Sequence, residues 1–319
     1  MKQVLEFEKP IVKLREEIEE MKKKLAAKPS DKLAQQVTDQ ERKLDELQRD
    51  IHSNLNPWQR VQISRHISRP YMLDYIKHCC DEFVEIHGDR HIGDDNAMPA
   101  GFATIGGQRV AIMGHQKGRD TKENLLRNFG SAHPEGYRKA LRLMRMAEKF
   151  GLPIVTLIDT PGAFPGIGAE ERNIAEAIAF NLREMMTLRT PVVAIVIGEG
   201  GSGGALGIGI ADKVLMMENA YYSVISPEGC AAILWKHREH APEAASALKL
   251  SAQDLAKLGI IDGVIPEPLG GAHNDHAAAA GSLKDALLLA LAELTKLPTA
   301  QLLEQRYQKF RALGQFTQG

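Results

Sequence analysis

The first 54 residues of the chain place charged and apolar side chains at helical spacing. Apolar residues recur every three or four positions from Ile11 to Leu25, and a similar spacing resumes from Leu33 to Ile51. The sequence KPSD at 28–31 interrupts this pattern. The pattern predicts a helical hairpin over residues 10–54, with one narrow apolar seam on each helix, ended by Pro57. We interpret this hairpin as a packing arm rather than as a catalytic element.

The pattern is mixed in the next part of the chain. Residues 58–98 show no clear period. From Thr104 to Ile112, side chains alternate as in a strand on both sides of Gly106-Gly107, which predicts a β-hairpin. Residues 135–150 carry apolar side chains on one helical face, and Gly151 follows them, so a helix is predicted to end there.

Two short apolar runs rich in β-branched residues each lead into a glycine-rich loop. Ile154–Ile158 precedes DTPGAFPG at 159–166, the first glycine loop, and Val192–Ile197 precedes GEGGSGGALGIG at 198–209, the second glycine loop. Strand, loop and helix in this repeated order predict a parallel sheet with crossover helices. Because neighbouring parallel strands end at the same edge, both loops are expected there, where ligands of open α/β sheets bind.

Further elements follow each glycine loop. A helix over 169–188 and a shorter one from Gly203 are predicted, followed by a strand at Asp212–Met217. Tyr222–Ile225 is compatible with one more short strand, and Ser251 is expected to cap a short helix.

The end of the chain is predicted to be helical. Residues 267–282 are expected to form a loop because they are rich in glycine, alanine and histidine. Two helices, at 283–296 and 300–313, are predicted to follow, with Ser282 and Thr299 as their N-caps.

Composition and charge exclude several classes of protein. Of 319 residues, 44% are apolar, which is enough for a substantial core. Forty basic and 41 acidic residues leave a net charge near zero, so a nucleic-acid or membrane-surface binder is not expected. Three cysteines without a C-x-x-C pair cannot form a four-cysteine zinc site, and no metal site is predicted. With no signal-like start and no apolar run of ~18 residues, a cytoplasmic protein without a membrane span is expected.

The second glycine loop matches two known motifs. Gly198, Gly200 and Gly203 have the spacing of a dinucleotide-binding loop, and Glu218 stands where a ribose ligand would. However, the helix that follows is too short for such a unit. Ser202 lies in G-x-S-x-G, the spacing of a hydrolase nucleophile, but no later histidine lies at a recognisable strand end. A purely structural alternative is tight packing of helix on strand.

A third interpretation assigns the chemistry to the backbone. Glycines at a strand-to-helix junction expose N–H groups, and the helix dipole adds partial positive charge. Such groups can hold an oxyanion without any side-chain nucleophile, and Gly203 and Gly204 are the natural pair. The tetrad DTPG in the first glycine loop could also indicate a GTPase switch, but the sequence has no G-x-x-x-x-G-K-[ST] loop.

Longer blocks of the sequence support this third interpretation. They are the two glycine loops together with VEIHGDRHIGDD at 84–95, GHQKGRDTKENLLRNFG at 114–130, HPEGYRKALRLM at 133–144, SVISPEGCAAILW at 223–235 and LSAQDLAKLGIIDGVIPEP at 250–268. These blocks resemble the carboxyltransferase alpha subunits of bacterial-type acetyl-coenzyme A carboxylases, over about residues 5–312.

The resemblance implies a crotonase-like (ClpP/crotonase) α/β fold, a superhelix of repeated ββα units. It implies a helical arm at 1–56, a carboxyltransferase core at 57–268 and a C-terminal helical extension at 269–319. It also implies an activity, the transfer of a carboxyl group from carboxybiotin to acetyl-CoA, which gives malonyl-CoA for fatty acid synthesis. The complex as a whole would be ATP-dependent.

The resemblance further implies partners. These are a beta subunit with a four-cysteine zinc ribbon, in an α2β2 heterotetramer, a biotin carboxyl carrier protein and biotin carboxylase. This chain would hold carboxybiotin, and the beta subunit would hold acetyl-CoA. Biotin itself would act as the base, so that Glu199 is interpreted as structural.

Three sets of candidate site residues follow. The catalytic set is the pair of backbone N–H groups at Gly203 and Gly204, as an oxyanion hole. The set expected to bind carboxybiotin is Gly162, Ala163, Phe164, Gly201 and Ser202. The set expected to contact CoA phosphates or the partner comes from a basic stretch at 115–145 and is Lys117, Arg119 and Lys122.

Alternatives remain open at this point. The basic stretch at 115–145 is equally compatible with a solvated helix face. The whole chain could also be a crotonase-type enoyl-CoA hydratase or isomerase, or a non-catalytic assembly subunit.

Overall fold

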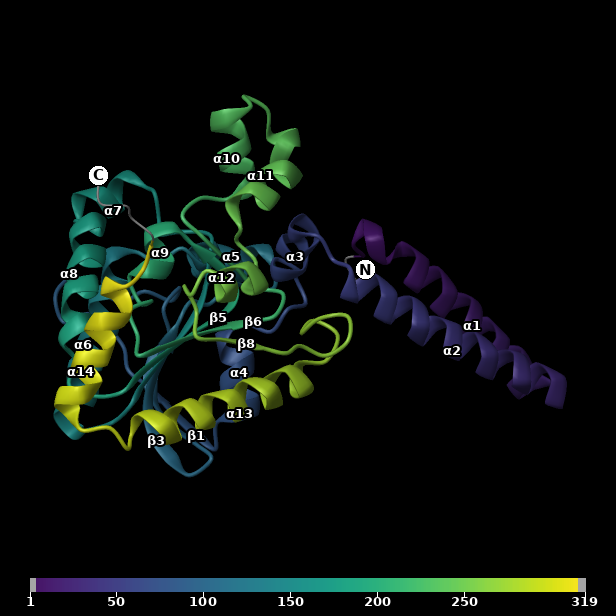
Figure 1. The fold of residues 1–319 in the computed structure, drawn as a ribbon, viewed down its shortest axis with the longest axis horizontal. Coiled ribbons are helices and arrows are strands. Elements are labelled where there is room, and N and C mark those ends of the chain that lie inside the picture. The colour runs from purple at the N-terminus through teal and green to yellow at the C-terminus, as the bar shows by residue number, and fades with distance from the viewer. Residues whose placement is uncertain (1–3, 315–319) are drawn as a thin grey trace.

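The computed structural model describes residues 4–314, so the ends of the predicted first and last parts, at 1–3 and 315–319, lie outside the described residues. A mixed sheet of eight strands forms its centre, in the order β1-β2-β3-β4-β5-β6-β8, with β7 paired to β5 (Figure 1). The strands are β1 (Glu82–Glu85), β2 (Ala100–Ile105), β3 (Gln108–Gly114), β4 (Ile154–Thr160), β5 (Val192–Gly201), β6 (Lys213–Met217), β7 (Tyr221–Ser223) and β8 (Gly263–Ile265).

Helices precede, connect and follow these strands. They are η1 (Glu6–Glu8), α1 (Lys9–Ala27), α2 (Asp31–Ser53), α3 (Pro57–Ser64), α4 (Met72–Cys79), α5 (Thr121–Leu126), η2 (Asn128–Gly130), α6 (Pro134–Phe150), α7 (Ile167–Glu171), α8 (Ile174–Thr187), α9 (Ser202–Leu206), α10 (Pro227–Leu234), η3 (Arg238–His240), α11 (Ala241–Leu248), α12 (Ala252–Lys257), α13 (His276–Leu294) and α14 (Thr299–Arg311).

The predicted N-terminal hairpin is confirmed. Helices α1 and α2 pack along each other and project away from the rest of the molecule (Figure 1). The prediction that Pro57 ends the arm was wrong, because α2 already ends at Ser53. Pro57 instead begins α3, at a position where a backbone N–H would have no partner within the helix, so its missing N–H costs no hydrogen bond. Asn56 caps that helix, because its side chain accepts from the Gln59 N–H at 2.9 Å.

The predicted β-hairpin and the helix after it are also confirmed. Strands β2 and β3 pair antiparallel, with Ile105 opposite Gln108. The turn residues Gly106 and Gly107 both have positive φ, which suits the tight turns that match the twist of a hairpin. Helix α6 ends at Gly151, which adopts the left-handed conformation.

The parallel part of the sheet runs from β3 through β4, β5 and β6 to β8. Strands β4 and β5 are buried along their whole length, which explains their continuous apolar runs. β5 continues to Gly201, four residues beyond the predicted end, so the first third of the glycine-rich sequence at 198–209 is strand. The two glycine loops therefore follow adjacent, parallel strands, as predicted.

The predicted single helix at 169–188 is wrong. The chain forms α7 and α8 with a break at Arg172-Asn173, where Asn173 has a φ of 64°. Asparagine tolerates this left-handed conformation better than most residues. The Arg172 side chain is held by Glu135 on α6, with Nε 2.7 Å from Oε1, so the break coincides with a tertiary contact.

The predicted start of the last two helices is also wrong. Helix α13 begins at His276 and is capped by Asp275, which accepts from the Ala278 N–H at 2.9 Å, so Ser282 lies inside the helix. The alanine-rich segment favours helix strongly enough to continue through a glycine. Thr299 is the first residue of α14, and Pro298 precedes it as the N-cap.

Helix α13 packs against the central core through Leu283, Leu287 and Leu291. The C-terminal helices therefore share the core of the sheet. The division of the chain into an arm, a core and an extension stays a prediction.

Candidate functional site

The two glycine loops lie against each other at the carboxyl edge of the sheet. A Cβ atom on Gly201 would lie 2.2 Å from the Pro161 carbonyl oxygen, and one on Gly204 would lie 2.4 Å from the Ala163 nitrogen. These neighbours are backbone atoms, which cannot rotate away as a side chain can. The close approach of the loops therefore requires glycine at both positions.

Gly203 and Gly204 have different surroundings within one turn. A Cβ atom on Gly203 would first meet the Ile178 side chain at 3.7 Å, an ordinary van der Waals contact. Helix α9 has Gly201 as its N-cap residue, with no side chain that could accept from the first N–H groups. Because α9 has only five residues, its dipole is small, so the N–H groups themselves are the available donors.

Ser202 stands at the strand-to-helix junction with a φ of 51° and is exposed. A strained serine at such a junction is typical of a hydrolase nucleophile. Within the described range 4–314, however, no hydrogen bond joins its hydroxyl to a histidine. The geometry therefore supplies no base for a serine nucleophile.

The first glycine loop is more open than the second. Gly162 has a φ of 154° and nothing within 4 Å of the position of a Cβ atom. The Thr160 hydroxyl donates to the Gly162 carbonyl oxygen at 2.7 Å and holds the turn. The Phe164 ring lies 4.1 Å from the His133 ring, and Gly162, Ala163 and Phe164 are all half-buried. This loop therefore borders accessible space.

A row of buried charged groups connects the ends of three strands. Lys117 follows β3, and its Nζ lies 2.6 Å from Asp159 Oδ1 and 2.7 Å from Glu199 Oε2. Arg65 Nε and the Tyr221 hydroxyl both donate to Glu199 Oε1, at 2.7 and 2.9 Å. Asp159 begins the first glycine loop and Glu199 lies in the second, so one lysine ties the two loops together.

Burial and the neighbouring charges shift the pKa values of the two acids in opposite directions. Burial alone would raise the pKa of Glu199, but the charges of Lys117 and Arg65 lower it to about 2. Burial raises the pKa of Asp159, and the negative charge of Glu199 acts in the same direction, against the lowering by Lys117. Glu199 is therefore an ionised acid with both oxygens bonded. Sequence reasoning missed Arg65, which lies in the stretch without a clear period, and Tyr221.

The three basic candidates do not gather at one place. The expected contact with a CoA phosphate or partner does not fit Lys117, because its ammonium group is buried between two internal carboxylates. Arg119 forms an ion pair with Asp74 and donates to the Arg69 carbonyl oxygen at 2.8 Å. Lys122 lies exposed in α5. The assignment to a phosphate or partner stays a prediction for Arg119 and Lys122.

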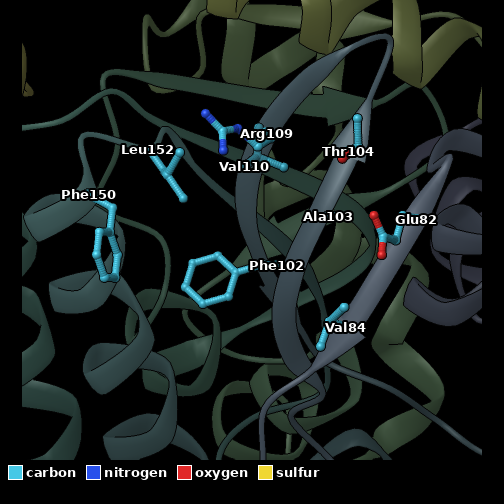
Figure 2. A pocket seen from close by; sticks show the side chains of 9 residues that line it. All are labelled: Glu82, Val84, Phe102, Ala103, Thr104, Arg109, Val110, Phe150 and Leu152. Carbon is cyan, nitrogen blue, oxygen red and sulfur yellow. The ribbon is translucent and has the colours of Figure 1, made fainter.

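An apolar hollow of about 330 Å³ lies elsewhere on the sheet. Figure 2 shows the rings of Phe102 and Phe150 facing it, with Leu152 beside them. Arg109 and Leu152, which also line it, stand at the amino ends of β3 and β4. The glycine loops follow the carboxyl ends of the parallel strands, so this hollow is at the opposite edge from them.

Among residues 4–314, no group of three or more His, Cys, Asp or Glu side chains is arranged to hold a metal ion. In the same range, no single helix is long and apolar enough to cross a membrane, although α13 and α14, bent by 118°, pass that test as a pair by length and composition.

Comparison with known proteins identifies relatives along nearly the whole chain. Residues 4–314 match the family model described as acetyl co-enzyme A carboxylase carboxyltransferase-like. The acetyl-coenzyme A carboxylase carboxyl transferase subunit alpha of Syntrophotalea carbinolica is 56% identical over 310 residues, which cover 97% of each chain. The protein of the same name from Thermus thermophilus is 52% identical over 98% of this chain and 99% of its own.

Solved structures of lower identity share the fold. A chain of transcarboxylase 12S has a TM-score of 0.58 at 20% identity, over 73% of this chain and 44% of that chain. A chain of a Pseudomonas malonate decarboxylase hetero-tetramer has a TM-score of 0.59 at 16% identity, over 73% of this chain and 91% of that chain. The expected crotonase-like α/β fold is confirmed. The chain belongs to the family of acetyl-coenzyme A carboxylase carboxyltransferase alpha subunits.

Proposed function

We propose that this chain forms the carboxyl-donor side of the site that transfers a carboxyl group from carboxybiotin to acetyl-CoA, giving malonyl-CoA for fatty acid synthesis. The observation that carries this proposal is the contact of Gly204 with the Gly162-Ala163 peptide at the carboxyl edge of the sheet. The name of the relatives, acetyl-coenzyme A carboxylase carboxyl transferase subunit alpha, supports the same reaction.

The residues at this edge fit a flat ring that carries a charged oxygen. Open space borders Gly162, and the N–H groups of Gly203 and Gly204 have no capping side chain. Carboxybiotin supplies the carboxyl group, and its ureido oxygen gains negative charge when that group leaves. Fixed N–H donors hold such a charge without the reorganisation that water needs, and losing one donor costs roughly 10²–10³ in rate. Ala163, Phe164, Gly201 and Ser202 would form the walls.

Glu199 is the acid nearest to these donors in the sequence, and we do not propose it as the base. Its oxygens accept from Lys117, Arg65 and Tyr221, and its low pKa keeps it ionised. A carboxylate stabilised to this degree is a weak proton acceptor near neutral pH. Its role in the proposal is to hold the second glycine loop in place.

The relatives are named subunit alpha, which implies a beta subunit as partner. We propose an α2β2 complex in the cytoplasm, with a four-cysteine zinc ribbon and the acetyl-CoA site in the beta subunit. A biotin carboxyl carrier protein would deliver carboxybiotin from biotin carboxylase. Leu206 in α9 is 41% exposed, Ile167 after the first loop is 80% exposed and Val224 after β7 is 77% exposed. Exposed apolar side chains so close to the loops support a protein partner that covers them.

The proposal is tested by reconstituting the chain with its beta partner and measuring carboxyl exchange between malonyl-CoA and a biotin derivative. Exchange is expected from the complex and not from either subunit alone. Ser202→Ala should keep most of the activity, because the proposed donors are backbone groups. An inactive Ser202→Ala variant with an intact fold would restore the hydrolase alternative. Hydration of an enoyl-CoA by the isolated chain would instead favour a crotonase-type hydratase.

A further inference from the structure

Helix α9 (Ser202–Leu206) and the residue after it, Gly207, receive hydrogen bonds at two carbonyl groups from side chains of other elements. The helix has only five residues, and the Gly203 carbonyl oxygen accepts from the Gly207 N–H at 2.9 Å. The Gly204 carbonyl oxygen instead accepts from the Tyr137 hydroxyl at 3.1 Å. The Gly207 carbonyl oxygen accepts from Asn181 Nδ2 at 2.9 Å. Two side chains, from α6 and α8, therefore complete the hydrogen bonds of this turn.

Tyr137 is built into the core as a fixed donor. Its side chain is fully buried, and burial raises the pKa of its hydroxyl, so the proton stays in place. Its ring occupies the space beside Gly207, where a Cβ atom would lie 2.6 Å from Cε1. Asn181 Nδ2 also donates to the Tyr137 carbonyl oxygen, at 3.0 Å. Both ends of the tyrosine are thus held while its hydroxyl contacts Gly204.

The turn needs such a restraint for a physical reason. Glycine has the greatest backbone freedom of all residues, and Gly203 and Gly204 are adjacent. A single helical turn is also unstable by itself. The ring of His115 also lies beside this turn; burial lowers its pKa to about 3 and an interaction with the Gly204 backbone opposes that lowering, although neither ring nitrogen has a hydrogen-bond partner of normal geometry among the described residues. The Tyr137 hydroxyl, at 3.1 Å, therefore donates the hydrogen bond of normal geometry that holds the Gly204 carbonyl group.

We infer that Tyr137 is a positioning residue of this carboxyltransferase site, whose hydroxyl holds the Gly204 carbonyl and so sets the direction of the Gly203 and Gly204 N–H groups. The inference rests on the proposed function, because only the proposed function assigns those N–H groups to an oxyanion hole. Asn181 supports the same turn from the other side. Neither side chain contacts the reacting atoms in this account.

The test compares Tyr137→Phe with Tyr75→Phe in the reconstituted complex. Tyr75 is also fully buried, but its hydroxyl has no hydrogen-bond partner among the described residues, so the control removes the same atom without freeing a carbonyl. Tyr137→Phe is expected to lower kcat of carboxyl exchange about tenfold with the KM for malonyl-CoA unchanged, as for the loss of one hydrogen bond. Tyr75→Phe is expected to leave both values unchanged.

A second readout does not depend on activity. Amide hydrogen exchange measured on a peptide that covers 201–209 should be faster in Tyr137→Phe than in the wild type, and unchanged in Tyr75→Phe. If Tyr137→Phe does not fold, Asn181→Leu gives the same test, with a lower kcat and faster exchange of the same peptide expected. Wild-type kcat in a folded Tyr137→Phe or Asn181→Leu variant would overturn the positioning role.

The variant Gly204→Ala separates this inference from the proposed function. If Gly204→Ala is inactive while Tyr137→Phe is fully active, only the positioning role fails. If Gly204→Ala is fully active with its fold intact, the anion hole itself fails, and the role of Tyr137 fails with it.

Discussion

The two glycine loops occupy one edge of the sheet, but they need glycine for different reasons. Gly162 in the first loop has room for a side chain and a backbone angle, φ 154°, that other residues rarely adopt. Gly201 and Gly204 in the second loop have no room, since a Cβ atom would collide with the backbone of the first loop. Glycine content alone does not distinguish these cases.

The difference suggests a division of roles. The first loop, with half-buried Gly162, Ala163 and Phe164, provides an open surface. The second loop contacts the Tyr137 side chain through the Gly204 carbonyl group and contacts the backbone of the first loop at Gly201 and Gly204. Its backbone is therefore held in place. In the proposed function, the ligand would enter beside the open first loop, and the second loop would supply donors whose positions do not change during the reaction.

The largest loss of stability is expected when the link between the loops is cut. Lys117→Met leaves Asp159 and Glu199 without their shared cation, and breaking a buried ion pair in this way costs about 3–5 kcal/mol. The free energy of unfolding, measured by denaturant titration, checks this. Lys122→Met, at an exposed lysine, is the control and should change the free energy of unfolding by less than about 0.5 kcal/mol. Equal stability of the two variants would show that the loops are not joined through Lys117.

A smaller loss is expected from the first loop itself. Gly162→Ala introduces no clash and only backbone strain, so it should destabilise the fold by about 1–3 kcal/mol. Gly281→Ala is the matched control, because Gly281 has equal space but lies inside helix α13. That change should stabilise the protein by about 0.5–1 kcal/mol. Thermal unfolding of both variants measures their changes in stability. Changes of Tm with the same sign in Gly162→Ala and Gly281→Ala would contradict this prediction.

The sequence predicted where the loops would meet but not how they are held. The shared edge follows from two apolar runs in β4 and β5, since such runs form buried parallel strands whose carboxyl ends align. The residues that fix the loops come from distant parts of the chain. Arg65 reaches Glu199 across 134 positions, and Tyr137 reaches Gly204 across 67. Local spacing carries no signal for such contacts.

The errors in the predicted elements have similar origins. The helix predicted over 169–188 runs through Asn173, whereas the structure has a break there that coincides with a contact between Arg172 and Glu135 on another helix. The start of α13 was missed because the glycine, alanine and histidine content of residues 267–282 predicts a loop, whereas alanine propensity and the cap at Asp275 favour a helix. Lys117 was expected to contact a CoA phosphate or the partner because spacing cannot show that two carboxylates surround it.

The most direct test of the anion hole compares two adjacent glycines in the reconstituted complex. Gly204→Ala places a Cβ atom 2.4 Å from the Ala163 nitrogen, which must displace one loop from the other, whereas Gly203→Ala makes only an ordinary contact with Ile178 at 3.7 Å. The measurement is kcat of carboxyl exchange, with assembly of both variants checked by size-exclusion chromatography. The account predicts a loss of roughly 10²–10³ for Gly204→Ala, as for a lost oxyanion donor, and a small change for Gly203→Ala. Equal kcat values for two assembled variants would contradict it.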